Sequence, residues 1–370
     1  MNKNINFFDT YISKEAYSNV KAVLDSTRLS EGKLVKKFEE SLEKELGIIN
    51  AVSVNSGTSS LHLALVLAGV GPGDEVILPA QTFVASGLVI TQQGATPVFA
   101  DIKYETGNID PISVRENITE KTKAIMVVHW GGLPVDLDEI NKIAKEYNLI
   151  VIEDAAHAIG ALYKSKPIGS ISDYTCFSFQ AIKHLTTGDG GAICTKNSTK
   201  YKEAKAFRWF GIDRETAEPS ILGERKYDIP KVGYKYHLND YAAALGLSNL
   251  PSLKKRIEKR QEIANQYRTG LSEVSGIKLF DTPGDRESAH WLFGIHVENR
   301  ESFIKKLSEA SIPTSVVHLG IDHNSVFGSG IRQDLVMQRK FDNTQIHLPM
   351  HDYIDTETVE YIIEKIKLGW

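Results

Sequence analysis

Three short motifs in this 370-residue chain combine residue types that can do chemistry. In the first, segment 55–60 (NSGTSS) lies between a predicted strand and a predicted helix. A glycine turn at a helix start presents backbone N–H groups and the positive dipole end to an anion. Gly57, Thr58 and Ser59 could therefore cradle a phosphate. Alternatively, the hydroxyl of Ser56 or Thr58 simply caps the helix.

The second motif is EDAAH (153–157), at the end of the most apolar predicted strand. Its acidic residues would lie at the carboxyl edge of a parallel sheet, where open α/β folds bind ligands. A semi-buried Asp154 carboxylate stays ionised best beside a cation, such as the protonated ring nitrogen of a cofactor. It could equally be a buried acid satisfied by loop amides. His157 has no second histidine at ligand spacing, so we expect no metal site.

The third motif is FSFQAIKHLTTGDGG (177–191), which places Lys183 in an apolar, aromatic and glycine-rich stretch. Burying an ammonium is costly unless its pKa falls or the amine reacts. Lys183 is therefore a candidate Schiff-base lysine, and the alternative is a surface lysine on a loop. A phosphate cradle, a strand-end carboxylate and a reactive lysine together are what pyridoxal 5'-phosphate (PLP) requires of a protein.

The sequence resembles the DegT/DnrJ/EryC1/StrS family of PLP-dependent sugar aminotransferases, which have the aspartate aminotransferase-like fold type I. The resemblance starts at LSEGKLVKKFEESL (29–42) and runs through the three motifs to YHLNDYAAALGLSNL (236–250). It continues faintly to IHLPMH (346–351). It implies that Lys183 bonds the cofactor and then shuttles a proton, and that Asp154 pairs with the pyridine nitrogen.

The resemblance also implies further cofactor contacts. Gly57, Thr58 and Ser178 would hold the phosphate. Phe83, in QTFVAS, matches the position whose ring stacks on the pyridine, although it could be an ordinary core phenylalanine. His157 matches a position near the ring hydroxyl that is often Gln in relatives.

Two positions depart from the family pattern. Segment 233–236 reads GYKY where many relatives read GYNY, and the family's Asn contacts the phosphate of the neighbouring subunit. Lys235 could supply that contact, or contact substrate, as a cation, or it could point elsewhere. In HWGGLP (129–134), Leu133 stands where relatives often carry Gln, so that part of the acceptor site can differ.

The run HLTTGDGG (184–191) resembles relatives that aminate carbon 4 of nucleotide-linked 4-keto-6-deoxy sugars. The resemblance thus implies amino transfer from glutamate to such a sugar. His318 matches a family histidine near the sugar, or is a structural histidine on a strand. Sites completed across a two-fold axis imply a homodimer, with trans contacts expected at Ser30, Gly32 and residues 233–240.

Three other functions stay open. One is a PLP- or pyridoxamine-dependent sugar dehydratase, whose known relatives replace the lysine with His. Here His184 directly follows Lys183, so the alignment of the motif decides which of the two residues occupies the position of the reactive lysine. The second is an aminotransferase acting on a small phosphorylated keto compound. The third is a non-catalytic PLP-binding regulator, which the presence of both Lys183 and Asp154 disfavours.

The elements that would position these residues alternate along the chain. From about residue 50, short apolar runs alternate with helical patterns, which indicates a mostly parallel sheet flanked by helices. A charged helical stretch (249–274) precedes shorter α and β patterns. We expect an α/β fold with a large PLP-binding domain over 1–250, including the N-terminal segment, and a smaller C-terminal α+β domain over 251–370.

Composition narrows the class of protein. The net charge of −4 provides no basic excess for a nucleic-acid backbone, so we expect no nucleic-acid partner. No signal peptide or stretch of about 18 apolar residues is present, which predicts a cytoplasmic protein without membrane contact. The only two cysteines, Cys176 and Cys194, lie in apolar runs and are expected to be core residues in a reducing compartment.

Overall fold

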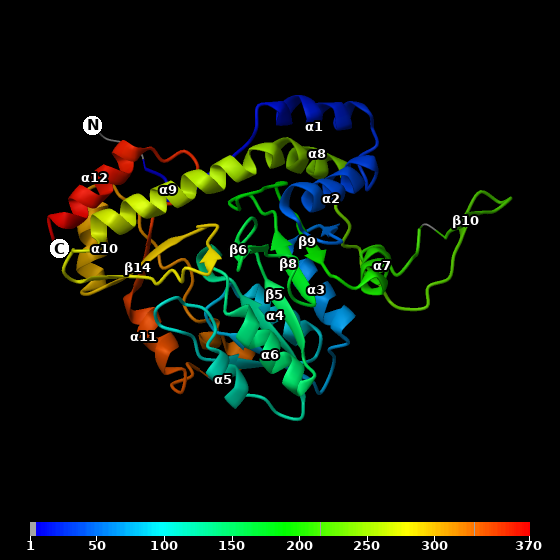
Figure 1. Ribbon diagram of the computed structural model, residues 1–370. Coiled ribbons are helices and arrows are strands. Elements are labelled where there is room, and N and C mark those ends of the chain that lie inside the picture. The colour runs from blue at the N-terminus through cyan, green and yellow to red at the C-terminus, as the bar shows by residue number, and fades with distance from the viewer. Residues whose placement is uncertain (1–4, 215, 329) are drawn as a thin grey trace.

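A seven-stranded sheet forms the centre of the computed structural model, which describes residues 5–214, 216–328 and 330–370 (Figure 1). The strand order is β1-β9-β8-β5-β4-β2-β3, and only the pairs that involve β9 are antiparallel. The strands are β1 (Val52–Val54), β2 (Glu75–Pro79), β3 (Thr96–Ala100), β4 (Thr122–Val128), β5 (Ile150–Asp154), β8 (Tyr174–Ser178) and β9 (Gly191–Cys194). The predicted α/β architecture with a mostly parallel sheet is confirmed.

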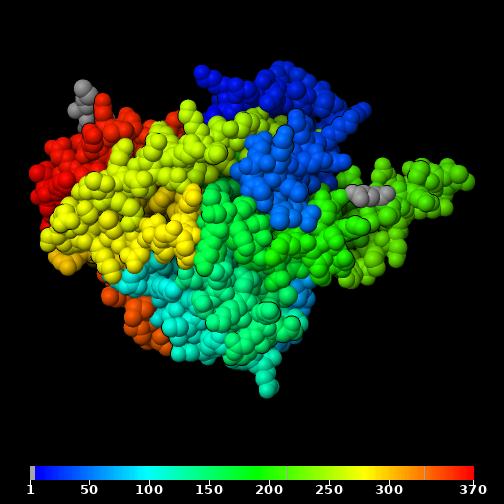
Figure 2. Space-filling view, viewed as in Figure 1, coloured from blue at the N-terminus to red at the C-terminus, as the bar shows by residue number. Residues whose placement is uncertain are grey.

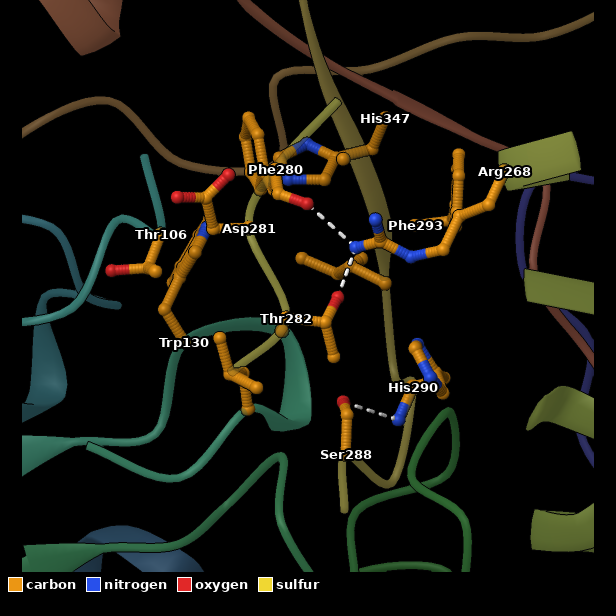
Figure 3. A pocket seen from close by; sticks show the side chains of 14 residues that line it. Thr106, Trp130, Arg268, Phe280, Asp281, Thr282, Ser288, His290, Phe293 and His347 are labelled. Atoms are coloured by element: carbon orange, nitrogen blue, oxygen red, sulfur yellow. Dashed lines mark hydrogen bonds between the residues drawn. The ribbon is translucent and has the colours of Figure 1, made fainter. Parts of the chain in front are cut away.

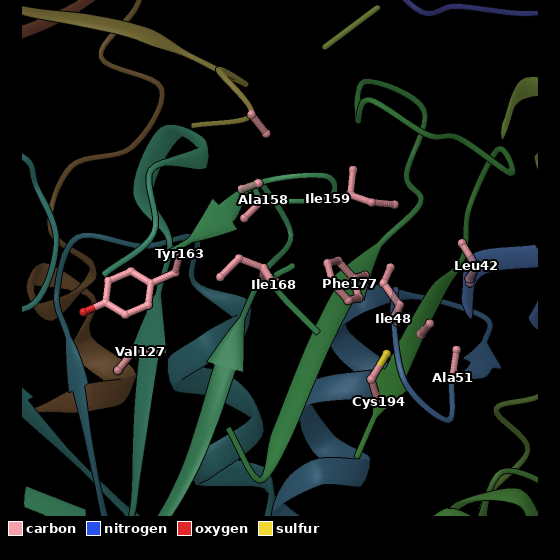
Figure 4. Packing of buried hydrophobic residues seen from close by; sticks show 14 of the residues in the cluster. Leu42, Ile48, Ala51, Val127, Ala158, Ile159, Tyr163, Ile168, Phe177 and Cys194 are labelled. Carbon is pink, nitrogen blue, oxygen red and sulfur yellow. The ribbon is translucent and has the colours of Figure 1, made fainter. Parts of the chain in front are cut away.

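Both faces of this sheet are buried, because successive side chains of each strand enter opposite cores. On β4, Ile125 and Val127 join one core, whereas Ala124 and Met126 join the other. Figure 4 shows the first core, in which Phe177 and Cys194 pack with Leu42 of the adjacent helix. Besides the long helix described below, the helices that contribute to the first core are α2 (Lys33–Leu46), α5 (Pro111–Glu116), α6 (Leu137–Tyr147) and α8 (Asp240–Asn249). Those of the second core are α3 (Gly57–Ala68), α4 (Ala85–Gln92) and α7 (Ser198–Phe207).

A second, antiparallel sheet lies in the C-terminal part and has its own core. It consists of β12 (Ile277–Leu279), β14 (Phe293–Val297) and β15 (Gln345–Leu348). It packs with α10 (Arg300–Glu309) and α12 (Thr356–Lys367). Strand β13 (Arg286–Glu287) pairs with β6 (Leu162–Tyr163) of the first part, and β6 pairs with β7 (Lys166–Pro167). Because this small sheet contains residues from both sides of residue 250, the predicted domain boundary there stays a prediction.

The long helix predicted over 249–274 is α9 (Leu253–Leu271), and it links the two parts. It starts after a 3₁₀ turn, η2 (Leu250–Ser252), in which Pro251 sits near the helix start. Ile257 packs in the first core, and Tyr267 packs in the C-terminal core. Figure 1 shows the helix running from α8 toward α12. Although the helix is rich in charged residues, one stripe of α9 is buried along its length.

The alternative of a structural His318 on a strand is wrong, because no strand forms around this residue. Only an isolated bridge joins Ser315 to His347. Val317 adopts a φ of 60°, and the His318 amide donates to the Val316 carbonyl at 2.7 Å. This is a γ-turn with positive φ, a strained conformation for a β-branched residue, and it is incompatible with an extended strand.

The remaining elements include a hairpin at the surface. A hairpin of β10 (Glu218–Pro219) and β11 (Arg225–Lys226) projects from the body, and Ile221 and Leu222 at its tip are fully exposed (Figures 1 and 2). The others are α1 (Glu15–Asp25), α11 (Val336–Thr344) and the 3₁₀ turns η1 (Trp130–Gly132), η3 (Ile321–His323) and η4 (Ser325–Phe327).

Two sequence expectations can be compared with this architecture. Cys176 on β8 and Cys194 on β9 are unpaired and buried, as predicted for core residues. In the part of the chain that the structure describes, no helix has the length and apolarity needed to cross a membrane.

The core beneath the lysine motif yields a stability prediction. Phe38 of α2 is completely buried, and its ring lies 5.3 Å from that of Phe179. We expect Phe38→Ala to lower the free energy of unfolding by about 3–5 kcal/mol through lost burial and the cavity left behind. Urea denaturation measures this. The control Ile112→Ala, at a side chain 68% exposed, should change it by less than about 0.5 kcal/mol, and equal losses would contradict the prediction.

Candidate active site

The carboxyl ends of the parallel strands bring most of the predicted site residues to one edge of the sheet. Asp154 ends β5, Ser178 ends β8, and Gly57 starts the helix that follows β1. Phe83 lies in the short loop between β2 and α4. This convergence follows from the parallel topology, since each strand delivers its following residues to the same edge.

The N-terminus of α3 is both capped and open to an anion. The Ser59 amide donates to the Ser56 hydroxyl at 3.0 Å, and the Ser59 hydroxyl donates to Asn55 Oδ1 at 2.6 Å. Ser56 is thus the cap, and Ser59 is engaged within it. Among the described residues, nothing accepts a hydrogen bond from the amides of Gly57 and Thr58. These two amides are the ones that could hold a phosphate.

Close backbone approach explains the glycines around this cradle. A Cβ on Gly57 would lie 2.8 Å from the Ser178 Cβ. A Cβ on Gly191 would lie 2.6 Å from the Ser56 carbonyl oxygen and 2.7 Å from the Gly57 amide nitrogen. The strands β8 and β9 therefore press directly against the start of α3, which places the Ser178 hydroxyl beside the two amides.

Asp154 is 7% exposed and is held by two donors. The Ser86 hydroxyl donates to Oδ2 at 2.8 Å, and the Ala156 amide donates to Oδ1 at 3.1 Å. Burial nevertheless raises the pKa of Asp154, against the opposing effects of Ser86, Ala156 and Lys183. Burial thus outweighs the stabilisation that these groups give the charged carboxylate.

Lys183 is a partly buried lysine with a perturbed amine. Its Nζ lies 3.6 Å from the centroid of a Trp291 ring. Burial lowers the pKa of Lys183 to about 7, although the charge of Asp154 acts in the opposite direction. The neighbouring His184 is turned away, because its Nε2 hydrogen-bonds the Ala289 carbonyl at 2.9 Å. Lys183, and not His184, is therefore the residue of this motif that interacts with Asp154.

His157 has an unused hydrogen-bonding atom. Its ring stacks on Trp291 with centroids 3.8 Å apart, and its Nδ1 is buried without a partner among the described residues. Burial first, and then the charge of Lys183, lower the pKa of His157 well below its usual value. The neutral imidazole can serve as a donor or an acceptor for a bound polar group.

Phe83 and His318 lie next to each other. Phe83 is 53% exposed, so it is not a core phenylalanine, and its ring centroid lies 5.2 Å from that of His318. Burial lowers the pKa of His318 to about 4, and the charge of Lys183 adds to the effect. The His318 carbonyl accepts from Gln81 Nε2 at 3.1 Å and from Gln345 Nε2 at 2.8 Å. These amides hold the γ-turn that presents the histidine.

Ser30 and Lys235 flank the cradle in this single chain. The backbone carbonyl of Lys235 lies 3.5 Å from Asn55 Nδ2, and its Nζ lies 5.1 Å from the Trp209 ring centroid. The Ser30 hydroxyl lies 3.4 Å from His237 Nε2. No described contact joins Ser30 or Lys235 to Lys183, so their roles stay predictions.

Several site residues escaped the sequence reasoning. Trp291 contacts both Lys183 and His157, but nothing in its local sequence indicates this. Ser86 holds Asp154, and it does stand in the quoted run QTFVAS, four residues after Thr82, with which it shares a 2.7 Å hydrogen bond. Spacing of i and i+4 at a predicted helix start was the signal that could have found it.

Trp130, Phe280 and His347 are among the residues that line a small cavity of about 40 Å³ (Figure 3). Trp130 Nε1 and His347 Nε2, on residues that line it, are buried without partners in the described part of the chain. Arg268 donates across its rim to the Phe280 carbonyl and the Thr282 hydroxyl. Its volume suits one or a few water molecules, so the cavity is not a sugar site.

The residues present fit PLP. The cradle at Gly57 leaves two amides and a hydroxyl for a phosphate. Asp154 is a buried carboxylate that a protonated ring nitrogen would stabilise, and the orphaned His157 Nδ1 can hydrogen-bond a ring hydroxyl. Lys183 supplies an amine whose lowered pKa favours bonding to an aldehyde.

Comparison with known proteins agrees with this fit. Residues 10–367 match the DegT/DnrJ/EryC1/StrS aminotransferase family, and the chain belongs to that family. It is accordingly a PLP-dependent aminotransferase, and its fold is that of the fold-type I enzymes. The family resemblance inferred from the sequence motifs is confirmed.

Individual relatives align over most of their length. GDP-perosamine synthase of Escherichia coli O157:H7 is 34% identical over 94% of this chain and 93% of its own. The UDP-4-amino-4-deoxy-L-arabinose–oxoglutarate aminotransferase of Shewanella sediminis is 35% identical over 82% of this chain and 80% of its own. The crystal structure of the sugar aminotransferase CalS13 from Micromonospora echinospora superposes with a TM-score of 0.94, at 33% identity over 99% of this chain and 100% of its own.

The lowered pKa of Lys183 has a measurable consequence for stability. Because the folded pKa, about 7, lies below the ordinary value of 10.5, the unfolded chain binds the proton more tightly. The resulting destabilisation is fully present below pH 7 and disappears as the pH rises toward 10.5. Cofactor-free Lys183→Met should therefore be more stable than wild type at pH 6.5, and this advantage should shrink by about 1.4 kcal/mol per pH unit above pH 7.

Urea denaturation of both proteins across this pH range measures the trend. Trp370→Phe, which changes no ionisable group, provides the control and should show a constant difference from wild type. A Lys183→Met difference that does not vary with pH would show that the amine is solvated in the folded protein.

Proposed function

We propose that this enzyme transfers an amino group from glutamate to carbon 4 of a nucleotide-linked 4-keto-6-deoxy sugar. The observation that carries the reaction type is the Lys183 amine, whose pKa is lowered to about 7 beside Asp154 and the cradle at α3. The substrate class is supported by relatives named for perosamine and for 4-amino-4-deoxy-arabinose. The second of these names also includes oxoglutarate, the keto acid that glutamate becomes on donating its amino group.

Each site residue then has a defined task toward the cofactor. PLP, when bound, supplies an electron sink that stabilises negative charge on the carbon losing a proton. The amides of Gly57 and Thr58 and the Ser178 hydroxyl bind the phosphate. Asp154, oriented by Ser86, keeps a proton on the ring nitrogen. Phe83 provides an exposed ring face for stacking, and His157 Nδ1 binds the ring hydroxyl.

Lys183 has a second task once the amino donor has released it from the cofactor. A general acid–base group works best with a pKa near the operating pH, because it must both accept and return the proton. A pKa of about 7 meets that requirement, whereas an ordinary lysine would stay protonated. The amine can therefore carry the proton between the two carbon positions that exchange it.

For the sugar, we propose contacts from His318, Lys235 and Ser30. His318 is neutral at physiological pH and lies against Phe83, where a sugar hydroxyl or keto oxygen could meet its ring. Lys235 offers a cation for phosphate, and Ser30 offers a hydroxyl on the same flank. We further propose a homodimer, because the projecting β10–β11 hairpin carries Ile221 and Leu222 fully exposed.

A substrate panel tests the reaction. With glutamate, we expect 2-oxoglutarate and a 4-amino sugar, identified by NMR, from at least one UDP-, GDP- or dTDP-linked 4-keto-6-deoxy sugar. Lys183→Ala should reduce turnover at least about 1000-fold, because both cofactor attachment and proton transfer are lost. A 3-keto sugar nucleotide and a small phosphorylated ketone complete the panel. Product from either of these, but from no 4-keto sugar, would contradict the proposed substrate.

Mixed dimers test whether Lys235 acts across the subunit interface. Lys183→Ala and Lys235→Ala homodimers should each be impaired, the second most clearly at limiting PLP. If Lys235 serves the partner's site, a random mixture of the two variants should regain about a quarter of wild-type activity, since half the dimers would contain one complete site. Absence of recovery in subunits shown to exchange would place Lys235 in its own subunit's site.

A further inference from the structure

We propose that Trp291 is a positioning residue for Lys183: its ring covers the amine, and its indole N–H anchors the backbone that leads into the lysine. The inference rests on the proposed role of Lys183 as the reactive amine. Trp291 belongs to the C-terminal part, just before β14, so this part would contribute directly to the chemistry of the large sheet.

Trp291 contacts Lys183 at two levels. Its ring centroid lies 3.6 Å from the lysine Nζ. Its Nε1–H donates to the carbonyl of Ile182, the residue directly before the lysine, at 3.1 Å. Trp291 therefore contacts the lysine amine and also holds the backbone directly before the lysine, which limits the volume that the amine can explore.

Trp291 is itself firmly held. It is 2% exposed, and it stacks on His157 at 3.8 Å and on Phe8 at 5.0 Å. On either side of it along the chain, the amides of Ala289 and Leu292 donate to the carbonyls of Gly132 and Gly131, both at 3.1 Å. Such a ring can act as a fixed wall.

Close packing explains the glycine pair in this docking. Gly131 and Gly132 have φ values of 62° and 100°, which favour glycine. A Cβ on Gly132 would lie 2.8 Å from the His157 carbonyl oxygen and 2.9 Å from the His290 amide nitrogen. The pair in HWGGLP thus permits the backbone contact that brings Trp291 to the lysine.

The residue after the lysine is tied to the same part of the chain. Arg256 donates to the His184 carbonyl, and His184 Nε2 hydrogen-bonds the Ala289 carbonyl at 2.9 Å. The backbone is therefore held on both sides of Lys183, while the amine faces the indole.

The indole has two opposite effects on the amine. Its π face attracts an ammonium, which raises the pKa of the amine. Its bulk excludes water, which lowers the pKa, and burial as a whole brings Lys183 from 10.5 to about 7. We expect the loss of water exclusion to be the larger effect, so replacing the ring with a smaller polar group should raise the pKa of Lys183.

NMR of the cofactor-free protein tests the geometry without reference to turnover. Reductive methylation with ¹³C-formaldehyde labels lysine amines, and the Lys183 signal is identified by its loss in Lys183→Ala. In wild type we expect a methyl signal displaced upfield by the indole ring current, with a titration midpoint near pH 7. A Lys183 signal at the ordinary lysine position would overturn the proposal.

Two variants test the contributions of the Trp291 ring and of its N–H donor separately. Trp291→Phe keeps a ring but loses the N–H, and should retain the upfield displacement and a midpoint within about half a unit of wild type. Trp291→Gln keeps a donor but loses the ring, and should lose the displacement and raise the midpoint by about one unit or more. We also expect its kcat to fall at least about tenfold. The control is Trp370, whose Nε1 donates to the Glu298 carbonyl outside the site. Trp370→Phe should change neither the displacement nor the midpoint of the Lys183 signal.

A folded Trp291→Gln protein with an unchanged midpoint would refute the role of the ring. If this variant does not fold, the wild-type spectrum and Trp291→Phe decide. Failure of the proposed reaction is distinguishable, because an enzyme inactive on every ketosugar could still show the displaced and titrating Lys183 signal. Conversely, a fully active aminotransferase with an ordinary Lys183 signal would refute only the positioning role.

Discussion

The burial of one amine beside one carboxylate is the constraint on which the rest of the site depends. Lys183 and Asp154 influence each other's pKa, yet burial dominates for both groups. A bound ligand that adds opposite charge and hydrogen bonds would stabilise the charged form of each group. The edge of the large sheet carries Asp154, and the Trp291 ring covers the Lys183 amine.

The sheet provides this constraint through its alternation. On β5, Glu153 points to the opposite side from Asp154 and pairs with His129 at 2.8 Å in a fully buried contact. The two adjacent acids in EDAAH therefore have different tasks. Glu153 forms a buried contact with His129, and Asp154 faces the site. A one-residue shift in register would exchange them, so strand pairing fixes which carboxylate is functional.

Local sequence patterns predicted most of the large sheet and the centre of the site. The short apolar runs that alternate with helical patterns from about residue 50 form buried parallel strands such as β2 and β5, because such a strand needs a continuous apolar run. Lys183 stood out because a lysine is unusual in such surroundings. Trp291 could not be found in this way, since its contacts lie more than 100 residues away in sequence. The γ-turn at Val317 also depends on contacts outside the local sequence, because the amides that hold it belong to Gln81, 237 residues from His318, and Gln345, 27 residues from it.

The helix α9 has a mechanical consequence. Because Ile257 is fixed in one core and Tyr267 in the other, the helix acts as a strut between the two parts of the chain. Hinged closure of one part over the other would have to bend this strut or remove one end from its core. The two buried ends of α9 therefore favour joint movement of the two parts over hinged closure.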